Sequence, residues 1–413
     1  MSVSAEDVES IRSWLASYGS DESGTEELRG MTRLLFTPEW LDAQLALKQK
    51  FEDLGMVAEF DEVGNLYGTY PGTDGTDDVV ATGSHVDTVV HGGQLDGALG
   101  IFGGYLAIKN LVETYGAPKK SLRVVSMAEE EGSRFPFVFW GSKNIVGTVP
   151  ASDIEGVVDN DGVSFADAMA ACGFGLRKSP VSPADRIKTF VELHIEQGNT
   201  LEMEGKKVGV VTAITGQRRY NIRLHGQANH AGTTRMCYRH DVIQVFAQIV
   251  NESIAKANEA GDPLVLTFGH IEVTPNTVNV VPGDAMFTMD CRHTDKAVLH
   301  AFTEEVEADM RRIAAEHGVS IEIDRWMDED PVPMDEKLVQ TIADVCEKNG
   351  ANWRMMHSGA GHDSQVIAPH IPTGMIFVPS IDGVSHNPAE DTETEDLKAG
   401  IDMLAETLHA LAY

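Results

Sequence analysis

Short apolar runs that end in polar residues recur along the chain, and they predict buried strands with functional groups at their ends. Val79–Ser84, Leu122–Met127 and Thr189–His194 are runs of this kind, and Val208–Ile214 is also predicted to be extended. The run Ala98–Tyr115 has the length of a helix. This alternation predicts an α/β domain with a mostly parallel sheet and helices on both of its faces.

The pattern changes after Gly216, where two predicted helices are flanked by shorter predicted strands. In chain order the segments are Arg219–His225, His240–Ala260, Leu264–Val273, Asp284–Arg292, Asp295–Gly318 and Ser320–Arg325. The order β-α-β-β-α-β is that of a ferredoxin-like α+β unit. Because polar motifs resume after it, we predict an inserted domain at residues 212–329 within a discontinuous first domain at 1–211 and 330–413.

Composition and charge restrict the class of protein. A chain of 413 residues is too long for one ordinary core. The net charge of −32 disfavours nucleic acid and anionic membranes as partners, and the apolar runs are shorter than the roughly 20 residues of a membrane span. The polar, acidic first residues predict no signal peptide. Four well-separated cysteines, Cys172, Cys237, Cys291 and Cys346, fit a reducing compartment, so we expect a cytoplasmic protein.

The segment 83–97 carries two histidines and two aspartates directly after a predicted strand. His85 and Asp96 are suitable ligands for a divalent metal, and the carboxylate of Asp96 could bridge two ions. Asp87 lies two residues after His85 and could orient its imidazole ring. One histidine and one aspartate alone would be explained as well by a polar loop.

Further carboxylates and histidines follow the other predicted strands. Glu129, Glu130 and Glu131 come after the second strand, His194 ends the third, and His386 lies near the C-terminus. Active sites of open α/β sheets collect at strand ends, and adjacent carboxylates offer one metal ligand and one free base. So many such groups at successive strand ends favour a two-metal centre over a series of solvated turns.

Five motifs resemble those of the M20-type metalloamidases, in the subgroup that hydrolyses ureido (N-carbamoyl) compounds. They are Gly-Ser-His-Val-Asp-Thr (83–88), Glu-Glu-Gly-Ser-Arg-Phe (130–135), Glu-Leu-His-Ile-Glu-Gln-Gly (192–198), Asn-His-Ala-Gly-Thr-Thr (229–234) and Ser-His-Asn-Pro (385–388). The resemblance runs from about residue 30 to the C-terminus. It includes non-catalytic segments, such as 261–268, so it is more specific than the metal motifs alone.

The resemblance implies a cofactor of two divalent ions per subunit, manganese or zinc and possibly cobalt. It assigns His85, Asp96 and His194 to one ion and Asp96, Glu131 and His386 to the other. Glu130 would be the catalytic base, because the Glu-Glu pair of the family directly precedes the glycine, here Gly132. Asp87 would support the catalytic groups, and Glu129 would be a bystander.

The resemblance also implies contacts with the substrate. The matching positions are Gln197, Arg219, Asn279, Arg292, Gly361 and His362. His230, in the inserted domain, would stabilise the reacting carbonyl oxygen, and in related dimers this residue can reach across from the partner subunit. The inserted domain would thus be a lid or a dimerisation domain of a homodimer. One departure is Arg235, which stands where the family usually has proline.

Several of these positions also have structural explanations. Arg292 could form an ion pair with Asp290, and Arg219 could be ordinary surface charge. Asn279 could be a turn residue, and His362 could support a neighbouring group without touching substrate.

The implied activity is metal-dependent hydrolysis of a ureido C–N bond in a small anionic substrate. Allantoate is the expected substrate, and an N-carbamoyl-L-amino acid is the alternative. A non-catalytic binding protein is disfavoured because the full ligand set and Glu130 are both present. The cyclic-amidohydrolase barrel is disfavoured because His85-Val86-Asp87 stands where that fold has His-x-His.

Overall fold

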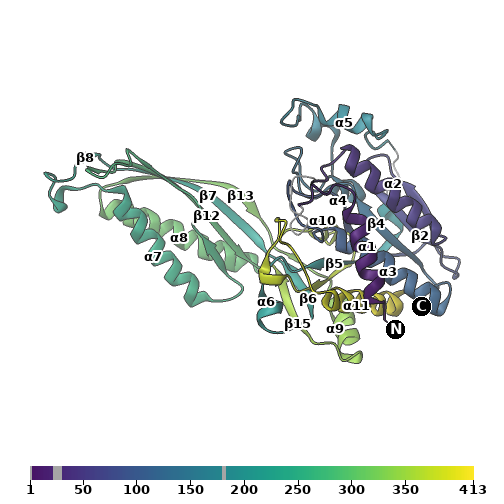
Figure 1. Cartoon of the computed structure of the whole chain (residues 1–413). Coiled ribbons are helices and arrows are strands. Elements are labelled where there is room, and N and C mark those ends of the chain that lie inside the picture. Colours follow the sequence, from purple (N-terminus) through teal and green to yellow (C-terminus); the bar gives the residue numbers. More distant parts are fainter. Residues whose placement is uncertain (1, 22–29, 179–182) are drawn as a thin grey trace. The chain divides into compact units, whose positions relative to one another are not determined.

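The computed structural model describes residues 2–21, 30–178 and 183–413. It divides into two compact units, each with its own core (Figure 1). The first unit combines Met1–Thr212 with Met334–Tyr413, and the second unit is Ala213–Pro333. In the described part of the chain, no helix is both long enough and apolar enough to cross a bilayer.

The first unit is built on one large sheet with helices on both faces. Its helices are α1 (Ala5–Ala16), α2 (Pro38–Asp53), α3 (Ala98–Tyr115), α4 (Trp140–Val146), α5 (Phe165–Ala171), α6 (Thr200–Met203), α9 (Glu336–Lys348), α10 (Asp363–Ile367) and α11 (Thr394–Ala412). Its strands are β1 (Val57–Phe60), β2 (Leu66–Tyr70), β3 (Val79–His85), β4 (Ser121–Met127), β5 (Ile187–Ile195), β6 (Val208–Ile214), β15 (Trp353–Ser358) and β16 (Thr373–Val378).

The sheet is mixed, so the predicted mostly parallel sheet is wrong towards its edges. The strand order is β1-β2-β4-β3-β5-β16-β6-β14, where β14 is Val332–Pro333, and β15 lies beside β6. The central pairs β4–β3, β3–β5 and β5–β16 are parallel, whereas β1–β2, β2–β4 and β16–β6 are antiparallel. Between β1 and β2 the chain turns at Asp61–Asn65, which is too short for the crossover that a parallel pair requires.

Helix α3 lies close against one face of the sheet because it carries glycines there. A Cβ atom at Gly100 would lie 2.6 Å from Cβ of Ser84, and one at Gly104 would lie 2.9 Å from a methyl group of Thr82. The opposite face packs against α4 and α10, through Ile145 and Ile367. The sheet is therefore buried on both sides, as its apolar strands predict.

The second unit is an antiparallel sheet with two long helices along one face (Figure 1). Its elements are β7 (Gly216–His225), β8 (Asn229–His230), α7 (Val242–Ala260), β9 (Val265–Thr267), β10 (Ile271–Thr274), β11 (Val280–Val281), β12 (Asp284–His293), α8 (Lys296–Glu316), β13 (Ser320–Glu329) and β14 (Val332–Pro333). The sheet order is β10-β12-β7-β13, with β9 also on β12. The single strand predicted at Leu264–Val273 is instead two strands, interrupted around Gly269, where a glycine weakens strand structure.

The parallel strands of the first unit end at one edge of the sheet. His85 is the last residue of β3 and lies in register with Met127, the last residue of β4. His194 of β5 lies in register with Phe377 of β16. The loops that follow these strands carry the remaining candidate residues, so the fold brings them to the same edge.

Candidate metal centre

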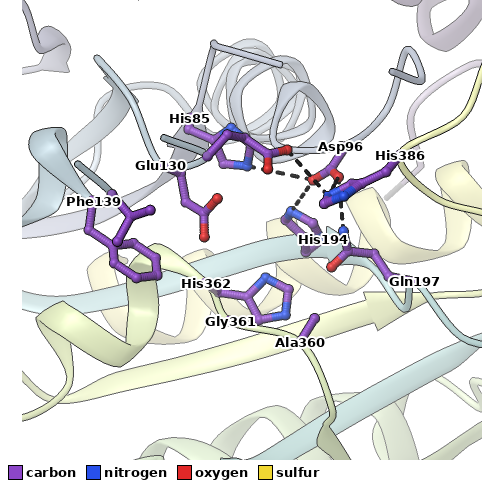
Figure 2. Close-up of a pocket in the computed structure, with 12 residues that line it drawn as sticks. His85, Asp96, Glu130, Phe139, His194, Gln197, Ala360, Gly361, His362 and His386 are labelled. Atoms are coloured by element: carbon purple, nitrogen blue, oxygen red, sulfur yellow. Dashed lines mark hydrogen bonds and ion pairs between the residues drawn. The ribbon is translucent and has the colours of Figure 1, made fainter. Parts of the chain in front are cut away.

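Three predicted ligands from β3, β5 and the loop between β3 and α3 converge on one point. Nε2 of His194 lies 3.2 Å from Oδ1 of Asp96, and Nε2 of His85 lies 3.6 Å from the same oxygen. All three side chains are buried, and their ligand atoms lie close enough together to hold one metal ion. Figure 2 shows the two imidazole rings turned towards the Asp96 carboxylate.

A second group uses the other oxygen of the same carboxylate. Nε2 of His386 lies 3.2 Å from Oδ2 of Asp96 and 3.4 Å from Oε1 of Glu131. These three residues also form a group that could hold a metal ion. Asp96 thus presents one oxygen to each group, which is the arrangement that a bridging ligand requires.

The ring nitrogens that face away from Asp96 have partners of their own. Nδ1 of His85 lies 3.1 Å from the carbonyl oxygen of Asp87 and 3.2 Å from its Oδ1. Nδ1 of His194 lies 3.0 Å from the carbonyl oxygen of Ile195. These contacts leave both Nε2 atoms facing the pocket, the orientation that metal-binding histidines need.

A further group, Glu192 with His194 and His362, is less suited to a metal. Oε1 of Glu192 accepts a hydrogen bond from Ser84 Oγ at 2.7 Å, and Oε2 accepts one from the backbone N–H of Ser364 at 3.1 Å. The Glu192 carboxylate is therefore already engaged in joining β3, β5 and α10.

The charges of the pocket are poorly balanced by the protein alone. Burial and the neighbouring Asp96 raise the pKa of Glu131 to about 7. Burial, together with Glu131 and Asp363, raises the pKa of Glu130 well above its usual range. Burial would also raise the pKa of Asp96, but its contacts with His194, His386 and His85 hold that pKa well below its usual range. Several carboxylates thus compete for too little positive charge.

These residues fit divalent cations. The two groups offer imidazole nitrogens and carboxylate oxygens, the ligand types that zinc, manganese and cobalt accept. Two such ions would supply the positive charge that the crowded carboxylates lack. Burying several carboxylates together costs free energy unless a cation balances their charge. The buried acids of this pocket are therefore the observation in favour of a bound metal.

Glu130 lies in the pocket with its carboxylate directed into the open space (Figure 2). Its backbone N–H donates to Oδ1 of Asp87 at 3.0 Å, and the N–H of Glu131 donates to Oδ2 at 3.2 Å. Asp87 therefore fixes the backbone of both glutamates while it also contacts His85. Glu130 also forms a group with His85 and Glu131 whose ligand atoms lie close enough together to hold a metal ion.

Glu129, which the sequence suggested to be a bystander, is buried and supports the same loop. Its Oε2 accepts the backbone N–H of Trp140 at 3.1 Å, and its Oε1 accepts that of Gly132. It thereby ties the turn around Glu130 and Glu131 to the start of α4.

The pocket has a volume of about 190 Å³ and contains three of the residues predicted to contact substrate. Gln197, Gly361 and His362 all line it. Gln197, however, donates from Nε2 to Asp96 Oδ2 at 2.8 Å, so it also orients a candidate ligand. His362 is buried, its Nε2 lies 2.8 Å from Ser358 Oγ, and burial and His194 lower its pKa well below the usual range.

Three further lining residues were not predicted from the sequence. They are Val138, Phe139 and Ala360. The aromatic run that follows Glu131 and the position of Ala360 next to Gly361 are the signals that could have identified them.

In the second unit, Arg219 and Arg292 share one carboxylate. Nε of Arg219 lies 2.7 Å from Oδ2 of Asp290, and Nε of Arg292 lies 2.9 Å from Oδ1. Nη2 of Arg292 also lies 3.1 Å from Oδ2. The Arg292–Asp290 ion pair considered from the sequence is therefore present, and Arg219 has a charged partner instead of being isolated surface charge.

His230 and Asn279 lie near each other at a small exposed ribbon of the second unit. His230 pairs with Val280 where β8 meets β11, and the carbonyl oxygen of Asn279 accepts the N–H of Ala231 at 3.0 Å. Nδ1 of His230 accepts the N–H of Gly232 at 3.0 Å, which leaves Nε2 available. Arg235 is exposed in the following loop.

The chain is similar to known proteins over nearly its full length. Residues 77–410 match the family described as Peptidase family M20/M25/M40. The chain is 55% identical to an allantoate amidohydrolase of Escherichia coli (strain K12), with 98% of each chain covered. It is 46% identical to an allantoate amidohydrolase of Bacillus subtilis (strain 168), covering 97% of this chain and 96% of the other. A hydantoinase/carbamoylase family amidase from Burkholderia multivorans has a similar structure, with a TM-score of 0.92, 31% identity and coverage of 100% and 98%. The chain therefore belongs to Peptidase family M20/M25/M40.

Proposed function

We propose that the protein is an allantoate amidohydrolase, which converts allantoate and water to ureidoglycine, ammonia and carbon dioxide. The observation that carries this proposal is the full-length similarity to two allantoate amidohydrolases, combined with a pocket in which one aspartate faces two groups of ligand-type residues. The reaction is the hydrolysis of a ureido C–N bond and not of a peptide bond.

Two divalent ions are the proposed cofactor, with manganese or zinc preferred and cobalt possible. His85, Asp96 and His194 would hold one ion, and Asp96, Glu131 and His386 would hold the other. Such ions, when bound, lower the pKa of water and polarise a carbonyl group.

Glu130 is the proposed proton carrier. Its carboxylate lies in the pocket, and burial raises its pKa above the usual range, which suits a group that accepts a proton from water and releases it again. As the new C–O bond forms, the proton of the water passes to Glu130. When the C–N bond of the substrate breaks, Glu130 returns this proton to the departing nitrogen, and the carbamate formed decomposes to carbon dioxide and ammonia.

Asp87 positions this step through the two backbone N–H groups that it holds. His230 is proposed to stabilise the oxygen of the tetrahedral intermediate by donating from Nε2. Arg292 is proposed to bind the substrate carboxylate, since a guanidinium group matches a planar carboxylate with two parallel hydrogen bonds. Gln197, Gly361, His362, Arg219 and Asn279 complete the proposed substrate contacts.

We further propose that the enzyme acts as a cytoplasmic homodimer with residues 212–329 as its lid or dimerisation domain. The cysteines support a reducing compartment: Cys172, Cys237, Cys291 and Cys346 are all free thiols. The exposed position of His230 supports a role in a second copy of the chain.

An N-carbamoyl-L-amino acid amidohydrolase is the alternative, favoured by the structural similarity to a carbamoylase-family amidase. Both reactions release ammonia, so one ammonia-release assay can compare kcat/KM on the two classes of substrate. We expect the manganese-loaded enzyme to show its highest kcat/KM on allantoate. A higher kcat/KM on any member of a panel of N-carbamoyl-L-amino acids would favour the alternative. Chelation should abolish either activity, and added Mn²⁺ should restore it.

A further inference from the structure

Glu390 is a buried carboxylate that joins two loops of the pocket. Its side chain is only 3% exposed. Oε1 accepts the backbone N–H groups of Leu95 and Asp96, each at 3.0 Å, and Oε2 accepts the hydroxyl of Ser385 at 2.8 Å. Every one of these contacts is made to Asp96, to the residue before it or to the residue before His386.

Further polar contacts join the two loops. Asp96 follows β3, whereas Ser385 and His386 lie nearly three hundred residues later. Ser385 Oγ lies 3.3 Å from Asp96 Oδ2, and Gln197 Nε2 donates to Ser385 Oγ at 3.1 Å. Within this network, Glu390 accepts the backbone N–H groups of the Asp96 loop. It thereby fixes the backbone position from which the Asp96 side chain extends.

Gly93 shows that the Asp96 loop is shaped around this carboxylate. A Cβ atom at Gly93 would lie 2.0 Å from Oε1 of Glu390, far inside van der Waals contact. The φ angle of Gly93 is not in the left-handed region, so the backbone conformation alone does not call for glycine. The absence of a side chain is therefore needed for Glu390 to approach.

The second ligand group depends more on such support than the first. His85 and His194 are buried residues of central strands. His386 instead lies in a loop, its side chain is 51% exposed, and its φ angle of 53° is one that residues other than glycine rarely adopt. The position of the His386 ring opposite Asp96 therefore depends on the hydrogen bond that anchors the neighbouring Ser385 to Glu390.

We propose that Glu390 is a positioning residue that holds Asp96 and His386 in register, so that its loss selectively weakens the metal site of Asp96, Glu131 and His386. This inference rests on the proposed two-metal centre. Outer partners of metal ligands commonly change metal affinity about 10- to 100-fold when they are removed.

The test is the number of Mn²⁺ ions bound per chain, measured by equilibrium dialysis and elemental analysis over a range of free Mn²⁺. We expect two ions in the wild-type protein. Glu390→Ala should retain the first ion with near wild-type affinity and bind the second at least about 10-fold more weakly. Glu390→Gln keeps an oxygen for the two N–H groups and should lose less.

Gly93→Ala tests the same contact from the other side, with Glu390 left in place. The added methyl group should displace the carboxylate and produce the same selective loss. Because both changes act on one contact, the double variant Gly93→Ala/Glu390→Ala should bind the second ion no more weakly than Glu390→Ala alone. Glu395→Ala, at an exposed glutamate, and Gly175→Ala, where a Cβ meets open space, are the matched controls.

The outcomes separate this inference from the proposal beneath it. Two ions bound with wild-type affinity in both Glu390→Ala and Gly93→Ala would overturn the role of Glu390 alone. Equal weakening of both ions would also overturn it, since Glu390 would then support the whole site. A wild-type chain that binds fewer than two ions would overturn the two-metal centre and this inference together. The melting temperature of each chelated variant shows that the chain is folded.

Discussion

The backbone N–H of Glu130 donates to Oδ1 of Asp87 at 3.0 Å, and this hydrogen bond joins the proposed proton carrier to the segment that carries His85. The same Asp87 oxygen lies 3.2 Å from Nδ1 of His85. One carboxylate therefore contacts a candidate metal ligand and also holds the backbone of the proposed proton carrier.

Replacing Asp87 should consequently damage metal binding and turnover together. In Asp87→Ala, the His85 ring loses an anionic neighbour and the Glu130–Glu131 turn loses two hydrogen bonds. We expect about 10- to 100-fold weaker metal binding and a comparable or larger fall in kcat. Metal titration and ammonia release measure the two effects. A variant with normal metal affinity and normal kcat would show that Asp87 has neither role.

His230→Ala should lower kcat far more than it weakens substrate binding. The proposed hydrogen bond from Nε2 forms to an oxygen whose charge develops only in the transition state. The loss of one such donor typically costs about 100- to 1,000-fold in kcat. Steady-state kinetics on allantoate give kcat and KM separately, and His225→Ala, at another exposed histidine of the second unit, is the control.

The same histidine gives a test of the proposed dimer. Chains carrying Glu130→Gln and chains carrying His230→Ala should each be nearly inactive, and mixed dimers should recover part of the activity if His230 acts in its partner's site. Hybrid formation is verified with differently tagged chains. Verified hybrids that remain inactive would place His230 in the site of its own subunit.

Arg292→Ala should weaken kcat/KM for allantoate by about ten- to a few hundred-fold, because a charge-assisted contact is worth roughly 1.5–3 kcal/mol. Arg292→Lys should restore only part of this loss, since a single ammonium group cannot reproduce the paired hydrogen bonds. A neutral amide analogue of allantoate should be affected much less. Equal effects on the charged and the neutral substrate would mean that Arg292 has only a structural role, in its ion pair with Asp290. Arg223→Ala, on the same sheet, is a suitable control.

The pH dependence of stability should reveal the buried Asp363. Burial raises the pKa of this carboxyl group to about 8, so the folded chain holds a proton there that the unfolded chain releases near pH 4. Its contribution to stability is fully present below about pH 4 and is lost as the pH rises through about 8, at up to about 1.4 kcal/mol per pH unit.

Asp363→Asn keeps the size of the side chain but replaces the carboxyl group with an amide that does not ionise. We therefore expect the melting temperature of the variant, relative to the wild type, to increase between pH 5 and about 8 and to level off above that pH when both proteins are chelated. A difference that does not change with pH would mean that Asp363 is ionised in the folded protein across this range.

Many elements of the first unit could be predicted because apolar runs and the polar residues at their ends indicate strands from the local sequence alone. The predicted helix Ala98–Tyr115 and the strand Val208–Ile214 have the observed bounds, and the strand ending at His85 differs by one residue. The antiparallel pairs at the sheet edges could not be predicted in this way. Parallel and antiparallel strands both read as apolar runs, so the pairing of β16 with β6 depends on tertiary packing.

The supporting residues of the site were harder to find than its candidate ligands. Histidines at strand ends are conspicuous in a sequence, whereas Glu390 and Gly93 are ordinary loop residues there. Their importance depends on a contact between segments about three hundred residues apart, which no local pattern encodes. Glu129 was harder to interpret for another reason: its carboxylate accepts the backbone N–H groups of Gly132 and Trp140, a turn geometry that no pattern of residue types encodes.

The most direct test of the central claim is the metal content and ammonia release of Glu130→Gln, measured beside Asp96→Ala with Mn²⁺ and allantoate. Glu130→Gln removes the proton carrier and leaves all five proposed ligands in place. It should bind two ions and lose about 100- to 10,000-fold in kcat, whereas Asp96→Ala should lose the metal itself. Equal loss of metal in both variants, or a near wild-type rate in Glu130→Gln, would contradict the assignment of Glu130 as the proton carrier of a two-metal hydrolase.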